Sequence, residues 1–151
     1  MKVAHNIKLT AFSYEEDDKE QIRQGLLKLV PFDLEQEKLE LSQTNAQGFK
    51  EKRIIIFELF MKKERNTTKF LKHIKDNLTT DQRNTLLEQI ESRLDEELNF
   101  FIRIDKSRFL KDGVLTLTEQ GNCYHIKINI AAYPSNREKA LEIVQEWLAG
   151  V

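Results

Sequence analysis

The sequence is poor in cysteine, in proline and in long apolar segments. Its 151 residues include a single cysteine, Cys123, which cannot form an intrachain disulfide, so no feature requires an oxidising compartment. The longest obvious apolar run, residues 54–57, is much shorter than the roughly 20 residues that cross a bilayer. The N-terminus lacks the apolar region of a signal peptide. We therefore expect a cytoplasmic protein without a membrane-spanning segment.

Motifs for catalysis and for metal or cofactor binding are also missing. The sequence contains no nucleophile elbow and no phosphate-binding loop. The candidate metal ligands are not spaced as in known metal sites; they are His5, His73, His125 and Cys123. The alternative of an enzyme rests on residues 95–97 and Asp105, whose carboxylates would bind a metal ion for phosphodiester hydrolysis. Consecutive acids at a helix end cannot all face one ion, so we expect no enzymatic activity, no metal and no cofactor.

Charged residues are abundant but unevenly distributed along the chain. The formal net charge is −1, which by itself does not favour nucleic acid as a partner. Residues 50–75 carry nine Lys or Arg against three acids, whereas residues 76–99 carry two against seven and residues 15–40 carry four against nine. This segregation is compatible with one basic surface on a nearly neutral protein. For each segment, an ordinary solvated helix face is the alternative.

The spacing of apolar residues predicts alternating groups of strands and helices. The expected strands cover residues 3–13, 37–43, 53–61, 99–105, 114–118 and 123–132. The expected helices cover residues 16–30, 66–78 and 79–98 and a C-terminal segment that begins at Ser135. Thr79 and Gln82 form a capping-box pattern, and Ser135 and Glu138 form a second one. Hairpins are expected for the second and third strands and for the last two strands.

The order β-α-β-β-α-α-β-β-β-α indicates an α+β fold. We expect a single mixed sheet with helices packed on one face, within a single domain over residues 1–151. At this length, one domain with a real apolar core is the default. A sheet covered on one side leaves its other face open, and that open face is where a function should be sought.

Two of the expected strands have an aliphatic side and a polar, partly aromatic side. The polar sides comprise Phe101, Arg103 and Asp105 in the first strand and His125, Lys127 and Asn129 in the second. Cations beside a ring on a flat sheet suit phosphate contact and base stacking, as in several sheet proteins that bind RNA. We predict phosphate contacts by Arg103, Lys127 and Lys8, and stacking by Phe101. Solvation or cross-strand pairing of the cations, and coverage of the ring by a loop, helix or second subunit, are the alternatives.

The densest basic stretch lies on the helix predicted over residues 66–78 and just before it. Its cations are Lys62, Lys63, Arg65, Lys69, Lys72 and Lys75. Lys69, Lys72 and Lys75 share a face because of their spacing of three. We predict that this cluster forms a phosphate-binding rim, with a solvated helix face as the alternative.

Five short segments distributed over nearly the whole chain carry a family resemblance. They are His5-x-Ile7, Arg93-Leu94-Asp95, Asn99-Phe100-Phe101-Ile102-Arg103-Ile104-Asp105-Lys106, Ala132-Tyr133-Pro134 and Arg137-Glu138-Lys139-Ala140. In this order they resemble an archaeal family described as predicted RNA-binding exosome subunits. The resemblance implies a fold similar to that of the large-subunit ribosomal protein that binds 5S RNA. It also implies signature positions at Arg103, Asp105, Lys106, Tyr133 and Arg137.

These observations predict a non-catalytic RNA-binding accessory protein of RNA processing or degradation, with exosome proteins as possible partners. Lys106 joins the expected RNA contacts through the resemblance. Asp105 has a second interpretation, in which it orients Arg103 and Lys106 by charge-assisted hydrogen bonds and contacts no RNA itself. The alternative function is a protein-interaction or homodimerisation module whose sheet face packs against a partner without RNA contact.

Overall fold

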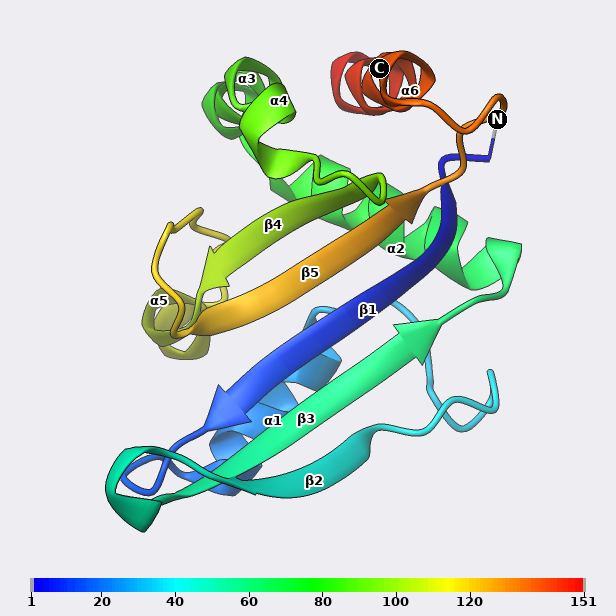
Figure 1. Cartoon of the computed structure of the whole chain (residues 1–151). Helices are drawn as coiled ribbons and strands as arrows, with labels where there is room; N and C mark the ends of the chain where they lie inside the picture. Colours follow the sequence, from blue (N-terminus) through cyan, green and yellow to red (C-terminus); the bar gives the residue numbers. More distant parts are fainter. Residues whose placement is uncertain (1, 151) are drawn as a thin grey trace. The chain divides into compact units, whose positions relative to one another are not determined.

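A computed structural model describes residues 2–150 as an α+β fold. One antiparallel sheet has the strand order β2-β3-β1-β5-β4 (Figure 1). Its strands are β1 (Ala4–Ser13), β2 (Ser42–Gln47), β3 (Arg53–Met61), β4 (Asn99–Asp105) and β5 (Cys123–Ile130). The helices are α1 (Lys19–Lys28), α2 (Glu64–Asn77), α3 (Thr80–Glu88), α4 (Ile90–Arg93), α5 (Lys106–Asp112) and α6 (Arg137–Ala149), and η1 (Phe49–Glu51) is a 3-10 turn. The predicted class, an α+β fold with a single sheet, is therefore confirmed.

Local sequence signals account for the ends of several helices. Asp18 caps α1, because its carboxylate accepts hydrogen bonds from the backbone N–H groups of Glu20 and Gln21. The predicted capping box of α3 is present: Thr79 Oγ1 accepts from Gln82 N at 3.1 Å, and Gln82 Oε1 accepts from Thr79 N at 2.8 Å. These contacts satisfy backbone donors that a helix leaves unpaired in its first turn.

The predicted last hairpin is wrong. Residues 114–118 form no strand; they make an isolated bridge between Leu117 and Ile104 and a backbone bond from Thr118 N to Arg103 O at 3.0 Å. β5 instead lies between β1 and β4. The prediction also missed α5, which ends at Asp112 and is followed by Gly113, where φ is +73°. Glycine adopts this left-handed conformation at little cost, so the chain leaves the helix there.

Other differences concern the bounds of elements. The hairpin of the second and third strands is confirmed, but β2 covers Ser42–Gln47, whereas the strand expected there covers residues 37–43. The long helix expected over residues 79–98 is divided at Gln89 into α3 and α4. Asn136, and not Ser135, caps α6, because its side chain accepts from Lys139 N at 2.8 Å. Each error concerns a position where tertiary pairing or a competing cap overrides a local pattern.

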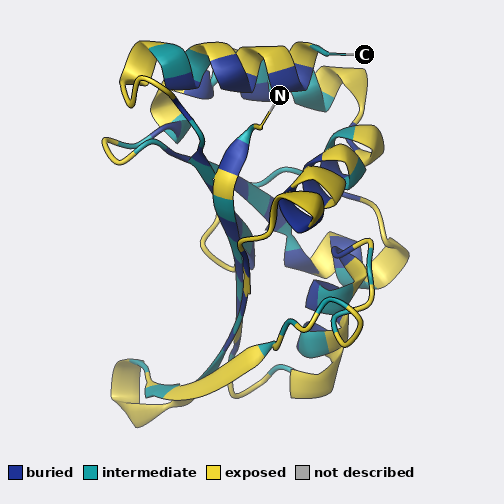
Figure 2. Ribbon diagram, turned by 90° about the vertical axis from the view of Figure 1, so that its right-hand side faces the viewer, coloured by how far each residue is buried: buried dark blue, intermediate teal, exposed yellow. Residues whose placement is uncertain are grey.

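The chain divides into two compact units, and the strands contribute residues to both. The first unit comprises residues 2–7, Met61–Ile102 and residues 127–150, and the second comprises Lys8–Phe60 and Arg103–Ile126. In the ribbon coloured by burial, buried residues lie in the strands and on the sides of the helices that face them (Figure 2). None of the described helices is both long and apolar enough to span a bilayer.

In the first unit, α2 covers one face of the strands, and α3, α4 and α6 lie together beyond the strand ends (Figure 1). The expectation that all helices pack on one sheet face thus holds for α2 but not for these three. α2 buries Phe70, Leu71 and Ile74, three residues recurring at helical spacing. Arg137 joins α6 to α4, because its guanidinium donates to the backbone oxygens of Leu94, at 3.0 Å, and Glu91, at 2.6 Å.

In the second unit, α1 and α5 lie against each other and against Tyr124 of β5. The buried hydroxyl of Tyr124 donates to the carbonyl oxygen of Ile22 at 2.9 Å, and its ring meets Phe109 edge to face at 5.8 Å. Gly25 of α1 allows this approach, because a β-carbon there would overlap the Tyr124 hydroxyl. The tyrosine therefore fixes the position of α1 on the second unit's core.

Candidate nucleic-acid interface

The densest exposed group of cations in the first unit lies on α2 and just before it. We call Lys62, Lys63, Arg65, Lys69 and Lys72 the α2 basic face; all five are exposed. The apolar side of α2 packs inward and leaves Arg65, Lys69 and Lys72 on its exposed side, while Lys62 and Lys63 are exposed in the segment just before the helix. Among the residues that the structure describes, Lys62, Lys63 and Lys69 form no ion pair. Their charge is therefore not neutralised by a neighbouring carboxylate.

Two lysines of the predicted helix cluster have intramolecular partners. Lys72 Nζ lies 2.7 Å from a carboxylate oxygen of Asp76, and this hydrogen bond is the main reason why the pKa of Asp76 falls below its ordinary value. Lys75 Nζ donates to the carbonyl oxygen of Gly150 at 3.0 Å and is half-buried. Lys75 thus stabilises the C-terminal end of α6. Of the three lysines that share this helix face, only Lys69 is therefore without an intramolecular partner among the described residues, so the three are not equally available to phosphate.

On the strands of the first unit, Phe101 and Lys127 are half-buried on the side that α2 does not cover. Asn129 on the same side donates to Asn99 Oδ1 at 3.0 Å and to Glu97 O at 3.3 Å. The side-chain amide of Asn129 thus stabilises the turn that precedes β4. Of the residues predicted to contact RNA, Phe101 and Lys127 therefore lie on this strand surface of the first unit.

The acidic residues 95–97, the alternative metal ligands, belong to that turn. Asp95 accepts hydrogen bonds from the backbone N–H groups of Glu97, at 2.9 Å, and Asn99, at 2.8 Å. Burial tends to raise the pKa of Asp95, but the bonds from Asn99 and Glu97 outweigh burial and leave this pKa below the ordinary value. Asp95 therefore has a structural function, because its carboxylate organises the turn into β4.

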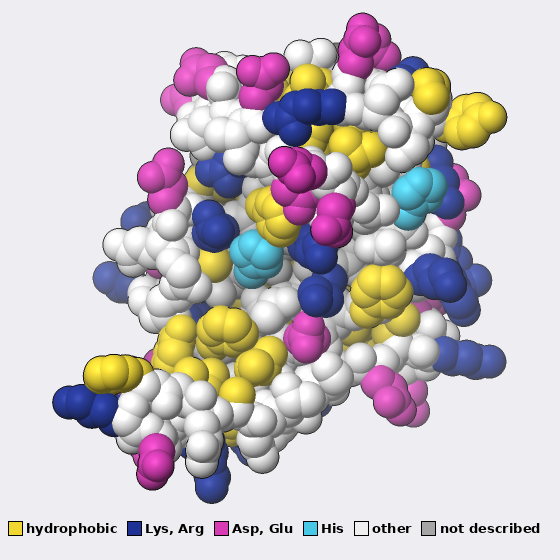
Figure 3. Space-filling view, viewed as in Figure 1, with side chains coloured by type: hydrophobic (Ala, Val, Ile, Leu, Met, Phe, Trp, Pro, Cys, Tyr) yellow, Lys and Arg dark blue, Asp and Glu magenta, His cyan; other side chains and the backbone are white. Residues whose placement is uncertain are grey.

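In the second unit, the corresponding strand surface mixes charges of both signs with apolar groups. Lys8 Nζ lies 3.3 Å from a carboxylate oxygen of Glu58, so this predicted phosphate contact is partly neutralised. Arg103 is half-buried, and Phe12 and Phe60 are exposed. Figure 3, viewed from the uncovered side of the sheet, shows basic and acidic side chains interspersed, with an apolar group near the β2–β3 end. The predicted cationic strand surface is therefore less basic than its strand alternation suggested.

Lys106 requires a correction of its predicted role. A phosphate contact requires an accessible ammonium group, whereas Lys106 is only 3% exposed. Its Nζ donates to the carbonyl oxygen of Phe12 at 2.6 Å, lies 3.8 Å from Asp17 and lies 5.4 Å from the centre of the Tyr14 ring. Burial lowers the pKa of Lys106, and the charge of Asp17 opposes this shift. The residue ties α5 to the end of β1 and is not available to RNA.

Two of the other signature residues, Asp105 and Arg137, also have local structural functions. Asp105 caps α5, because its Oδ1 accepts from Arg108 N at 2.9 Å. Arg137 binds the end of α4, as described above. Tyr133 is different, since its side chain is 92% exposed. The family resemblance includes Tyr133 as a signature position, but Tyr133 was not predicted as a candidate for base stacking. The sequence feature that could have indicated this is an aromatic residue directly before Pro134 and the polar residues 135–136.

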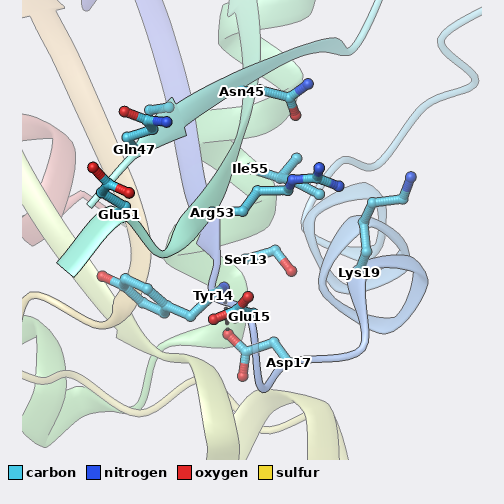
Figure 4. A pocket seen from close by; sticks show the side chains of 11 residues that line it. Ser13, Tyr14, Glu15, Asp17, Lys19, Asn45, Gln47, Glu51, Arg53 and Ile55 are labelled. Carbon is cyan, nitrogen blue, oxygen red and sulfur yellow. Dashed lines mark hydrogen bonds between the residues drawn. The ribbon is translucent and has the colours of Figure 1, made fainter. Parts of the chain in front are cut away.

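A polar groove of about 620 Å³ lies in the second unit beside the end of β1 (Figure 4). The charged side chains that line it are Glu15, Asp17, Lys19, Glu51 and Arg53. Acids outnumber bases in this set, so the groove does not suit a phosphate. Asn45 and Gln47 of β2 also line it.

These features define a small α+β protein with a cationic helix surface and a mixed strand surface. Residues 6–131 match the model of a protein family described as RNA binding. The chain therefore belongs to this RNA-binding family.

Relatives of known name or structure extend this similarity over the whole chain. RNA-binding protein PAB1135 of Pyrococcus abyssi (strain GE5 / Orsay) is 29% identical over 147 residues, which cover 97% of this chain and 95% of the relative. The crystal structure of protein AF2318 from Archaeglobus fulgidus has a TM-score of 0.85 at 27% identity and covers 97% of this chain and 99% of that one. The structure of Mth689 from Methanothermobacter thermautotrophicus has a TM-score of 0.78 at 25% identity, with coverages of 97% and 98%.

Proposed function

We propose that this protein binds RNA mainly through the α2 basic face. The observation that carries the proposal is the exposure of Lys62, Lys63 and Lys69 without ion-pair partners among the described residues. Ammonium groups in this state attract phosphates and release condensed counterions when they bind RNA. Membership of the RNA-binding family and the name of the Pyrococcus relative support RNA as the polyanion.

The strand residues contribute secondary contacts in this proposal. Arg103 and Lys127 supply phosphate contacts, Lys8 contributes less because Glu58 competes for its charge, and Phe101 offers a partly exposed ring for stacking. None of these groups forms a base-reading array, so we expect little sequence preference. Affinity should depend on phosphate spacing and salt more than on base identity.

At the biological level, we propose a non-catalytic, cytoplasmic accessory protein of RNA processing or degradation. The resemblance of the signature segments to predicted exosome subunits supports exosome proteins as partners. The same resemblance supports a relationship in fold to the ribosomal protein that binds 5S RNA. In this proposal the whole chain acts as one RNA-binding domain, and RNA incubated with the purified protein remains intact.

The decisive experiment compares two triple variants that lose the same charge. The first replaces Lys62, Lys63 and Lys69 by glutamine. The control replaces three lysines exposed elsewhere, Lys28, Lys38 and Lys111, by glutamine. In electrophoretic shift assays with mixed-sequence RNA at low salt, the first variant should lose about tenfold or more in affinity, and the control should lose little.

The rival function, a protein-interaction module without RNA contact, gives a different result. In that case the wild-type protein and the first variant would bind mixed-sequence RNA equally weakly at all salt concentrations. Equal losses in the two triple variants would also contradict the proposal, because they would show that net charge and not the α2 basic face determines affinity.

A further inference from the structure

The edge strand β2 lacks the features that normally prevent a sheet edge from pairing with another chain. β2 occupies one end of the strand order, and β3 is its partner on one side only. Its sequence, Ser-Gln-Thr-Asn-Ala-Gln, contains no charged residue and no proline, and all but one of its residues are exposed. Natural proteins usually protect exposed edges with charges, prolines or bulges. β2 therefore presents an open template for a further strand.

The hydrogen bonding of the hairpin determines which residues face the open edge. Gly48 N donates to Lys52 O at 2.7 Å, next to the pair formed by Gln47 and Arg53. Hydrogen-bonded and non-hydrogen-bonded pairs alternate in an antiparallel ladder. Gln43, Asn45 and Gln47 consequently direct their own backbone N–H and C=O groups away from β3. These groups are free to pair with a strand of another chain.

We infer that β2 pairs antiparallel with β2 of a second copy of this chain. The register that aligns the outward backbone groups places Asn45 opposite its own counterpart and Gln43 opposite Gln47 of the other copy. Such an interface is isologous, so the same strand surface is used twice about a two-fold axis. Because β2 carries no charge, this pairing brings no like charges together within the strand.

The residues on either side of β2 favour the same partner. An antiparallel arrangement brings the segment before β2 of one copy beside the segment after β2 of the other. Residues 49–51 form the turn η1 between β2 and β3, so this contact involves the turn of one copy and the segment before β2 of the other. Residues 33–40 carry four acids and one lysine, whereas residues 50–53 carry three bases and one acid. Acidic and basic segments therefore meet twice in the dimer, which is charge complementarity between identical chains.

An exposed apolar group at the same end of the second unit gives the dimer a hydrophobic component. Phe49 is 85% exposed, and Ile54 and Ile56, which oppose Ala46 and Thr44 across the hairpin, are half-buried. Pairing of β2 would bring the turn that carries Phe49 beside the segment of the other copy that contains Leu41. RNA offers no strand ladder to the outward backbone N–H and C=O groups of β2, so a second copy satisfies more of these hydrogen-bonding groups.

Sedimentation equilibrium of the full chain across a range of concentrations tests the inference. We expect the wild-type protein to approach twice the mass of one chain. Asn45→Lys should raise the dimer dissociation constant by about tenfold or more, because the two introduced ammonium groups oppose each other across the axis. Gln120→Lys, which adds the same charge at an exposed position outside β2, should leave the dissociation constant nearly unchanged.

A mixing experiment distinguishes this interface from any other. Asn45→Glu alone should also weaken the dimer, whereas an equimolar mixture of Asn45→Lys and Asn45→Glu should dimerise again, since opposite charges now meet at the axis. Circular dichroism checks that each variant folds. A monomeric wild type at every concentration, or dimers of both single variants as stable as the wild type, would overturn the inference.

Discussion

Lys106 is a buried cation whose ammonium group stabilises the second unit. Its Nζ donates to the carbonyl oxygen of Phe12, and Asp17 lies 3.8 Å away. Lys106→Met keeps most of the side-chain volume but leaves the carbonyl without this donor and Asp17 without its charge partner. We expect the free energy of unfolding to fall by about 1–3 kcal/mol in urea titrations.

The exposed Lys111 on the same helix provides the control, because Lys111→Met should change the free energy of unfolding by less than about 0.5 kcal/mol. RNA affinity of Lys106→Met, measured where the variant is folded, should equal that of the wild type. A Lys106→Met variant that is as stable as the wild type but binds RNA more weakly would indicate that Lys106 contacts RNA directly.

Tyr124 makes the stability of the second unit sensitive to alkaline pH. Burial raises the pKa of its hydroxyl well above the usual 10.0, and the charge of Asp17 adds to this shift. The folded protein therefore retains a proton that the unfolded chain releases near pH 10. The stability from this group is complete below pH 10 and is lost as the pH rises from 10.0 towards the raised folded-state pKa.

Tyr124→Phe isolates this effect. At neutral pH the variant should lose about 1 kcal/mol, because Ile22 O no longer accepts the buried hydroxyl. Above pH 10, the wild type should lose up to about 1.4 kcal/mol per pH unit more than the variant. Urea titrations over this range measure both slopes. Parallel slopes would show that the tyrosine titrates normally in the folded protein.

At the scale of elements, α5 depends on its cap. It has only seven residues, and Asp105 supplies a side-chain acceptor for its first turn. Asp105→Ala should cost about 1 kcal/mol of stability, and Asp105→Asn should restore most of it, since asparagine is also a good N-cap. Both variants should bind RNA as the wild type does. Loss of RNA binding without loss of stability would instead support a direct role of Asp105 in the interface.

Elements with local determinants could be predicted from the sequence, whereas elements fixed by distant partners could not. The capping box of Thr79 and Gln82 lies within four residues, and its pattern identified the start of α3. β2 has a polar sequence, and its position depends on six residue pairs with β3. Residues 114–118 look like a strand, but β5 pairs with β1 and β4 in their place. The strand propensity of a segment does not show which of two candidate strands will pair with its neighbours in the sheet.

The same distinction applies to the candidate site. The basic composition of α2 is visible in the sequence, but the acceptor of Lys75 is Gly150, 75 residues away. Likewise, the family resemblance placed Lys106 among the expected RNA contacts, but its ammonium group donates to the carbonyl oxygen of Phe12, 94 residues away. The sequence therefore identified which element is basic without showing which of its cations remain available.

For the whole molecule, a net charge of −1 means that RNA affinity must come from local cations and not from overall attraction. The logarithm of the binding constant should fall linearly with the logarithm of salt concentration, by about 0.7 for each phosphate contact on single-stranded RNA. Removal of Lys62, Lys63 and Lys69 should therefore reduce the slope by about 2.

Fluorescence anisotropy with labelled single-stranded RNA at several salt concentrations measures this slope. The triple Lys28, Lys38 and Lys111 variant has the same net charge and should keep the wild-type slope, since slope reports contacts and not charge at a distance. An unchanged slope in the Lys62, Lys63 and Lys69 variant would mean that phosphates contact other cations. Arg103 and Lys127 on the strands would then become the principal candidates for the interface.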